Sequence, residues 1–223
     1  MTVKLFVQAL VKFFSGLILL GGLIFLPAGT ILFRNGWLLL EILFIPMFLA
    51  GIVLMICNPE LLKKRLQANE KESEQRQVIL LSGLMFLVSF VLSGLNFRFR
   101  WIIMPDWTVW VAAGVFLLAY LLYGEVLREN TYLSRTVEVQ ENQKVVDTGL
   151  YGIVRHPMYA ATVFLFLSMP LVLGSPASFL VMLGYLPIIA KRVRNEEQVL
   201  KEGLEGYSEY MERVRYRIIP FIW

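Results

Sequence analysis

Apolar blocks of nearly membrane-spanning length recur along the whole chain, and they constrain its fold more than any other feature. We compare each block with the roughly 20 residues that an α-helix needs to cross a bilayer. The six blocks are Leu5–Leu26, Trp37–Cys57, Val78–Leu95, Trp107–Tyr123, Tyr159–Leu173 and Ala177–Ala190. The first four are long enough to span. The last two are short, because 15 residues of helix rise only about 22 Å, so the sequence predicts five to six crossings.

The composition supports this interpretation, since 57% of the residues are hydrophobic and the mean hydropathy is +0.65. One soluble core could not bury so much apolar surface, so lipid is the expected solvent. We therefore predict an all-α fold, an integral membrane helical bundle with a cytoplasmic C-terminal helix, in a single membrane domain over residues 1–223. Residues 1–124 hold four transmembrane helices. Residues 125–223 form the catalytic region, with a cytoplasmic loop, a helical hairpin and a C-terminal amphipathic helix.

The basic residues predict how the bundle is oriented. If the amino terminus lies inside and six blocks span, all of the 21 Lys and Arg residues except Arg34, Arg98 and Arg100 lie on the inside, with Lys12 in the inner half of the first block. This is a strong positive-inside bias, which predicts that both termini face the cytoplasm in a multi-pass membrane protein. The same distribution explains the basic charge by membrane orientation, so we expect no nucleic-acid partner.

The counts of cysteine and histidine limit the chemistry that the chain can perform. It has one cysteine, Cys57, and one histidine, His156. A single cysteine excludes an internal disulfide and a thiolate metal cluster. A single histidine argues against a zinc or haem site, so we expect no metal.

The single histidine lies in a polar stretch, residues 147–159, between two apolar blocks. An apolar hairpin follows from Ala160 to Ala190, broken at Leu173–Pro176, and polar residues return at 191–197. A hairpin leaves its two ends on the same side. We therefore expect residues on either side of it to meet in a cytoplasmic active site: Arg155, His156 and Tyr159 from one end, and Arg194, Glu196 and Glu197 from the other.

The residue types at this meeting point suggest binding roles. Pro157 suits the first position of a helix, whose first-turn N–H groups could then face an anionic group. Arg155 and Arg194 could each bind a carboxylate through two hydrogen bonds. The glutamates could bind ribose hydroxyls or an ammonium group. Four tyrosines could stack on a base or line an acyl channel, or belong to the interfacial aromatic belt: Tyr151, Tyr159, Tyr207 and Tyr210.

These residues occur in a recognisable pattern. Tyr151-Gly-Ile-Val-Arg-His-Pro-Met-Tyr159, then Glu196-Glu197, then Tyr207-Ser-Glu-Tyr210 resemble the isoprenylcysteine carboxyl methyltransferase family, whose wider group includes the bacterial membrane phospholipid methyltransferases. The resemblance is detailed over about the carboxyl-terminal third. It is specific for the superfamily and not for the substrate, and Ala161 stands where many relatives have glycine.

The resemblance implies a membrane enzyme that binds S-adenosyl-L-methionine between the Arg-His-Pro loop and the C-terminal helix. Arg155 and Glu196 would lie nearest the chemistry, although either of the adjacent glutamates could match the essential one. The cofactor-binding candidates are Tyr151, His156, Pro157, Tyr159, Arg194, Glu197, Tyr207 and Tyr210.

The favoured acceptor is the carboxylate of an isoprenylcysteine-like or other isoprenoid or lipid substrate. This lipophilic substrate would enter from the membrane lipids that surround the bundle. A carboxylate is already ionised near neutral pH, so an arginine to orient it would suffice. An amine or a thiol would need Glu196 or His156 to remove a proton.

Three alternatives stay open: a phospholipid amine N-methyltransferase, a sterol-reductase-like enzyme that uses NADPH, and a non-catalytic membrane protein of the same fold. One further residue has no assigned role. Glu41 lies inside the second apolar block, where a carboxylate is a candidate for function or for pairing with another helix.

Overall fold

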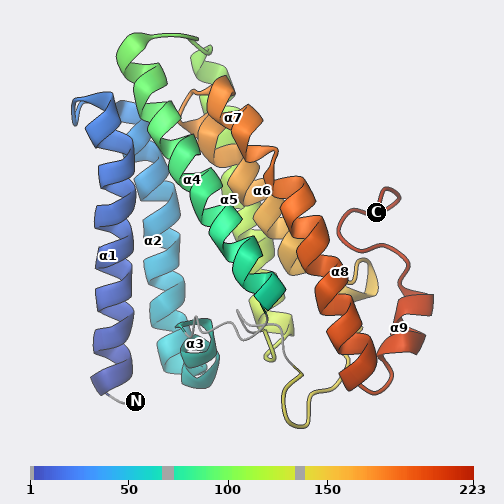
Figure 1. Cartoon of the computed structure of the whole chain (residues 1–223). Coiled ribbons are helices and arrows are strands. Elements are labelled where there is room, and N and C mark those ends of the chain that lie inside the picture. Colours follow the sequence, from blue (N-terminus) through green and yellow to red (C-terminus); the bar gives the residue numbers. More distant parts are fainter. Residues whose placement is uncertain (1–2, 67–72, 134–138) are drawn as a thin grey trace.

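The computed structural model describes residues 3–66, 73–133 and 139–223, and every regular element in these ranges is a helix. The prediction of an all-α bundle is therefore confirmed. Figure 1 shows the long helices running beside one another, with the first residues of α1 (Val3–Ala28), the short helix α3 (Pro59–Leu66) and α9 (Tyr207–Arg213) toward the lower end.

Five segments of the described chain are long and apolar enough to cross a membrane. Four coincide with α1, α2 (Arg34–Cys57), α4 (Ser73–Phe99) and α5 (Asp106–Glu129), and the fifth covers Pro176–Gly203. Helix α6 (Pro157–Val172) is apolar but has only 16 residues, a rise of about 24 Å. The count of five long helices and one short one agrees with the predicted five to six.

Close approach of α1 and α4 depends on Gly94. A Cβ atom at this position would lie 2.6 Å from the carbonyl oxygen of Ile24 and 2.9 Å from Cβ of Pro27. Small residues allow membrane helices to pack this closely. The adjoining core contains side chains with no exposed surface from three other helices, Leu39, Phe116 and Val172.

The predicted hairpin is present, with its turn where the sequence placed it. Helix α6 ends at Val172 and α7 (Pro176–Met182) begins after Gly174, whose φ is +71°. Buried polar groups attach the turn to α4: Ser93 Oγ donates to Ser178 Oγ at 2.9 Å, and Asn96 Nδ2 donates to the carbonyl of Gly174 at 3.1 Å. Such bonds hold membrane helices in register because no water competes for them.

The second arm of the hairpin differs from the prediction. Helix α8 runs from Tyr185 to Gly203 without a break at Ala190, and α9 begins after Gly206, whose φ is +81°. The change from apolar to polar residues near Lys191 is therefore a change in the surroundings of one helix. The expected amphipathic C-terminal helix consists of the last turns of α8 and the separate helix α9, with the chain broken between Gly203 and Tyr207.

Glu41 lies on an exposed face of α2. This position excludes a role in pairing helices inside the described bundle.

Candidate active site

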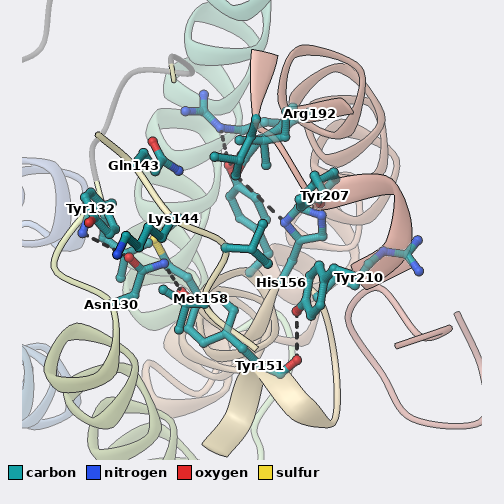
Figure 2. Close-up of a pocket in the computed structure, with 18 residues that line it drawn as sticks. Asn130, Tyr132, Gln143, Lys144, Tyr151, His156, Met158, Arg192, Tyr207 and Tyr210 are labelled. Atoms are coloured by element: carbon teal, nitrogen blue, oxygen red, sulfur yellow. Dashed lines mark hydrogen bonds and ion pairs between the residues drawn. The ribbon is translucent and has the colours of Figure 1, made fainter. Parts of the chain in front are cut away.

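A pocket lies where the start of α6 meets α8, lined by these helices, by α9 and by the loop between α5 and α6. Its volume is about 100 Å³. Figure 2 shows His156, Tyr207 and Tyr210 on one side of the pocket in that view and Tyr132, Gln143 and Lys144 on the other.

The hairpin brings together most of the residues that the sequence predicted to meet. Tyr159 donates a short hydrogen bond to Glu196. Arg155 Nε donates to Glu197 Oε1 at 2.7 Å, and His156 Nε2 lies 3.3 Å from the same oxygen. The juxtaposition across the hairpin is confirmed for these five residues.

Arg194 does not join them, because it is exposed and lies outside the pocket lining. Arg192 lies at the place expected for Arg194: it lines the pocket, and its Nε donates to the hydroxyl of Tyr159 at 2.9 Å. The sequence contained the signal for this residue, since Arg192 precedes Glu196 by four positions and shares its helix face. It was missed because the second arm of the hairpin was expected to end at Ala190, before Arg192.

The guanidinium of Arg155 is buried and has partners on each side. Nε and Nη2 each lie 2.7 Å from Glu197 Oε1, while Nη1 donates to the carbonyls of Val214 and Arg215 at 2.7 and 2.9 Å. A substrate carboxylate could not use these N–H groups in the same way without displacing a partner. The contacts make Arg155 a clamp between the loop, α8 and the C-terminal segment.

Glu197 is the buried centre of this clamp, with 5% of its surface exposed. Besides Arg155 and His156, it accepts a 2.7 Å hydrogen bond from Arg217 Nε, and the Arg217 guanidinium lies 5.3 Å from the ring centroid of Trp223. A buried carboxylate is tolerated only with such partners.

The backbone joins the same segments. The N–H groups of Arg155 and His156 donate to the carbonyls of Tyr216 and Arg217 at 2.9 and 2.8 Å. The carboxyl-terminal segment thereby supports the loop from behind, on the side away from the pocket lining.

Glu196 is the glutamate that faces the pocket. Its side chain is 23% exposed, its Oε1 lies 3.8 Å from His156 Nδ1, and its other oxygen accepts from Tyr159. Glu197 is not among the lining residues. The geometry thus separates two adjacent residues that the sequence could not distinguish, one turned toward the pocket and one behind its wall.

Three tyrosines form an aromatic part of the wall. Tyr210 donates to the carbonyl of Tyr151 at 2.7 Å, and Asn130 Nδ2 donates to the Tyr151 hydroxyl at 3.0 Å. The ring centroids of Tyr207 and Tyr210 are 5.7 Å apart. Burial raises the pKa of all three phenols, so they remain protonated.

The hydroxyl of Tyr207 differs from the other two. It is buried and has no hydrogen-bond partner among the described residues. A buried hydroxyl without a partner costs free energy, and this one belongs to a residue that lines the pocket. A polar ligand atom, such as a carboxylate oxygen or a ribose hydroxyl, would give the Tyr207 hydroxyl the partner that it lacks.

The start of α6 does not provide the anion site that its proline suggested. Pro157 stands in the first turn as predicted, but the N–H groups of Tyr159 and Ala160 both donate to the carbonyl of His156, at 3.1 and 3.2 Å. These groups are therefore not available to an anion.

The loop between α5 and α6 forms a further wall of the pocket, through residues that were not predicted from the sequence: Asn130, Tyr132, Gln143 and Lys144. These are polar residues in a polar loop, where nothing in the local sequence distinguishes a pocket wall from a solvated connector. No group of three or more His, Cys, Asp or Glu side chains suited to a metal ion occurs in the described ranges.

Comparison with known proteins gives two findings. A family model described as phospholipid methyltransferase matches residues 107–205, the segment from α5 to the end of α8. The chain is also 30% identical, over 117 residues and 47% of its length, to the Delta(14)-sterol reductase of Mus musculus. That alignment spans only 28% of the reductase. The family match supports the superfamily that the motifs resemble, without singling out the carboxyl methyltransferases, and with the spanning helices it supports a multi-pass membrane protein.

Proposed function

We propose that this chain is an integral membrane methyltransferase that uses S-adenosyl-L-methionine and acts on a lipophilic acceptor. The observation that carries the proposal is the pocket between the Arg-His-Pro loop and α8, most of which lies in the segment matched by the phospholipid methyltransferase family. The pocket presents a carboxylate, Glu196, and a buried phenol without a partner, Tyr207, in an otherwise aromatic and polar wall.

The wall suits the parts of this cofactor. The rings of Tyr207 and Tyr210 line the wall that would face the adenine, and the Tyr207 hydroxyl has no partner that a polar ligand atom would have to displace. Glu196 offers negative charge for the sulfonium, the ammonium or the ribose hydroxyls. When bound, the cofactor would supply a methyl group from its sulfonium, which becomes a neutral thioether. The protein would contribute mainly by holding the acceptor in line with that methyl group.

The residue roles follow from the contacts. Arg155, Glu197 and Arg217 position the loop that carries His156, since their charged groups face one another. Glu196, Tyr159 and Arg192 are the connected polar groups that face the reacting atoms. We therefore move the acceptor-orienting role proposed for Arg155 to Arg192, which remains in contact with the pocket.

Two classes of acceptor fit this arrangement. The resemblance favours a lipid carboxylate, which Arg192 would orient and which would need no base. The pocket-facing carboxylate favours a lipid amine, because Glu196 could attract the ammonium form and accept its proton, which frees the nitrogen lone pair that then attacks the methyl group. The sterol reductase likeness supports a third reading, in which the pocket takes NADPH.

Calorimetric titration of S-adenosylhomocysteine into detergent-purified protein tests the cofactor. We expect saturable binding to the wild type and binding weakened at least tenfold by Glu196→Gln. Arg194→Ala is the matched control, because Arg194 is exposed on the same helix. No binding by folded wild-type protein, or tight binding of NADPH in its place, would overturn the proposal.

Transfer of a labelled methyl group then separates the acceptors. A farnesylated cysteine derivative and phosphatidylethanolamine, each supplied in the same mixed micelles, represent the carboxylate and the amine. Methylation of the first alone supports the carboxyl methyltransferase, and methylation of the second alone supports the phospholipid N-methyltransferase.

A further inference from the structure

We infer that Lys144 is a ligand-binding residue of this pocket and that it recognises the carboxylate of the ligand's amino-acid end. The inference rests on the proposed function, because it assigns one part of S-adenosyl-L-methionine to one side of the pocket. Lys144 belongs to none of the motifs that led to the site, and it lies in the loop between α5 and α6.

The groups that would ordinarily bind an anion here are already engaged. The N–H groups of Tyr159 and Ala160 donate to the carbonyl of His156. Arg155 faces Glu197 and two backbone carbonyls. The carboxylate of an amino-acid ligand therefore needs another cation.

Arg192 is a poor choice for that carboxylate. Its Nε donates to the same Tyr159 hydroxyl that is hydrogen-bonded to Glu196. Arg192 is also the residue proposed to orient the acceptor, so a cofactor carboxylate bound there would compete with the acceptor for the same guanidinium. The ammonium and sulfonium groups of the ligand are the ones that Glu196 attracts.

Lys144 is better placed than Arg192 to bind the ligand carboxylate. It lines the pocket, it is exposed enough to move, and no ion pair or hydrogen bond of its side chain occurs within the described parts of the chain. In the view of Figure 2 it stands with Gln143 and Tyr132 across the pocket from His156 and Tyr207. The pocket thus has a cation on one wall and Glu196 on another, and this separation of charge matches a zwitterionic amino acid.

The test compares two ligands that differ only at the amino-acid end. S-adenosylhomocysteine carries the amino acid, whereas 5′-deoxy-5′-methylthioadenosine keeps the adenosine and the thioether but has a methyl group in its place. Both are titrated into wild-type protein, Lys144→Ala, Lys144→Arg and Lys201→Ala. Lys201 is the charge-matched control, an exposed lysine of α8 outside the pocket lining.

We expect Lys144→Ala to weaken the binding of S-adenosylhomocysteine by about twofold to fivefold, the range of one exposed ionic contact. The affinity for methylthioadenosine should not change, Lys144→Arg should retain most of the preference, and Lys201→Ala should behave as wild type. Added salt should reduce the preference of the wild type more than that of Lys144→Ala.

The outcomes distinguish the two proposals. If wild-type protein binds neither ligand, the methyltransferase proposal fails. If wild-type protein binds both and Lys144→Ala keeps the full preference for S-adenosylhomocysteine, or weakens both ligands equally, the assignment of Lys144 alone is overturned.

Discussion

The two buried tyrosines of α9 differ in whether their hydroxyl groups have a hydrogen-bond partner. Tyr210 and Tyr207 are both buried, but Tyr210 donates a hydrogen bond and Tyr207 has no partner among the described residues. We expect Tyr210→Phe to destabilise the ligand-free protein by about 1 kcal/mol, and Tyr207→Phe to leave it unchanged or slightly more stable.

Added S-adenosylhomocysteine should raise the unfolding temperature of Tyr207→Phe less than that of Tyr210→Phe. Tyr207→Phe should lose part of that shift, because its hydroxyl is the one that a ligand can satisfy. Thermal unfolding in detergent, with and without the ligand, measures both effects. Equal destabilisation of the ligand-free protein by the two substitutions would contradict the interpretation.

The charged residues behind the pocket should form a graded series. Arg155→Ala leaves the buried Glu197 without the guanidinium that contacts it through two nitrogens, so we expect a loss of about 3–5 kcal/mol. Arg217→Ala should cost less, because the side chain of Arg217 is 31% exposed and Arg155 remains. Arg213→Ala is the control, since its 2.9 Å ion pair with Asp147 is largely exposed and should contribute little. Denaturant unfolding of the three variants gives the order, and a large effect at Arg213 would refute it.

At the scale of elements, the close contact between α1 and α4 leads us to predict how Gly94→Ala changes stability. Gly94→Ala places a methyl group against the backbone of α1, and overpacking of this kind costs about 1–3 kcal/mol. Gly83→Ala is the matched control in the same helix, because no atom lies within 4 Å of its added Cβ. The melting temperatures of the two variants should separate, with Gly94→Ala lower, and equal values would contradict the packing.

The sequence predicted elements better than contacts. The hairpin was predictable because Leu173–Pro176 combines a glycine and a proline between two apolar runs. The extent of α8 was not, because a helix can leave an apolar environment for a polar one without any break in its backbone. That error concealed Arg192, whose position depends on the helix phase.

The clamp of Arg155 was beyond sequence reasoning for another reason. Two of its partners are the backbone carbonyls of Val214 and Arg215. Every residue has a carbonyl, so no side-chain pattern announces one as an acceptor. The motif identified an important arginine, but the tertiary fold decides what that arginine binds.

At the scale of the molecule, the pocket and the ends of the bundle predict a topology. The junction of α4 and α5 lies at the upper end in Figure 1, and the end of α8 lies at the lower end. In a Cys57→Ser background, we expect a membrane-impermeant maleimide to label Arg100→Cys on intact cells, and Lys201→Cys only after permeabilisation. The reverse pattern would place the pocket on the outer side and overturn the predicted orientation.

The only imidazole of the chain stands in the pocket wall, within 4 Å of both glutamates. Protein made with isotope-labelled histidine and no other label should therefore give one set of side-chain signals in a magnetic resonance spectrum, all from His156. Overlap, which limits such spectra for helical membrane proteins in micelles, would not arise. The chemical shifts of the two ring nitrogens would report the location of the proton between Glu196 and Glu197, and they would do so before and after each ligand is added. A protein that carries a single histidine at this point has its own reporter in place.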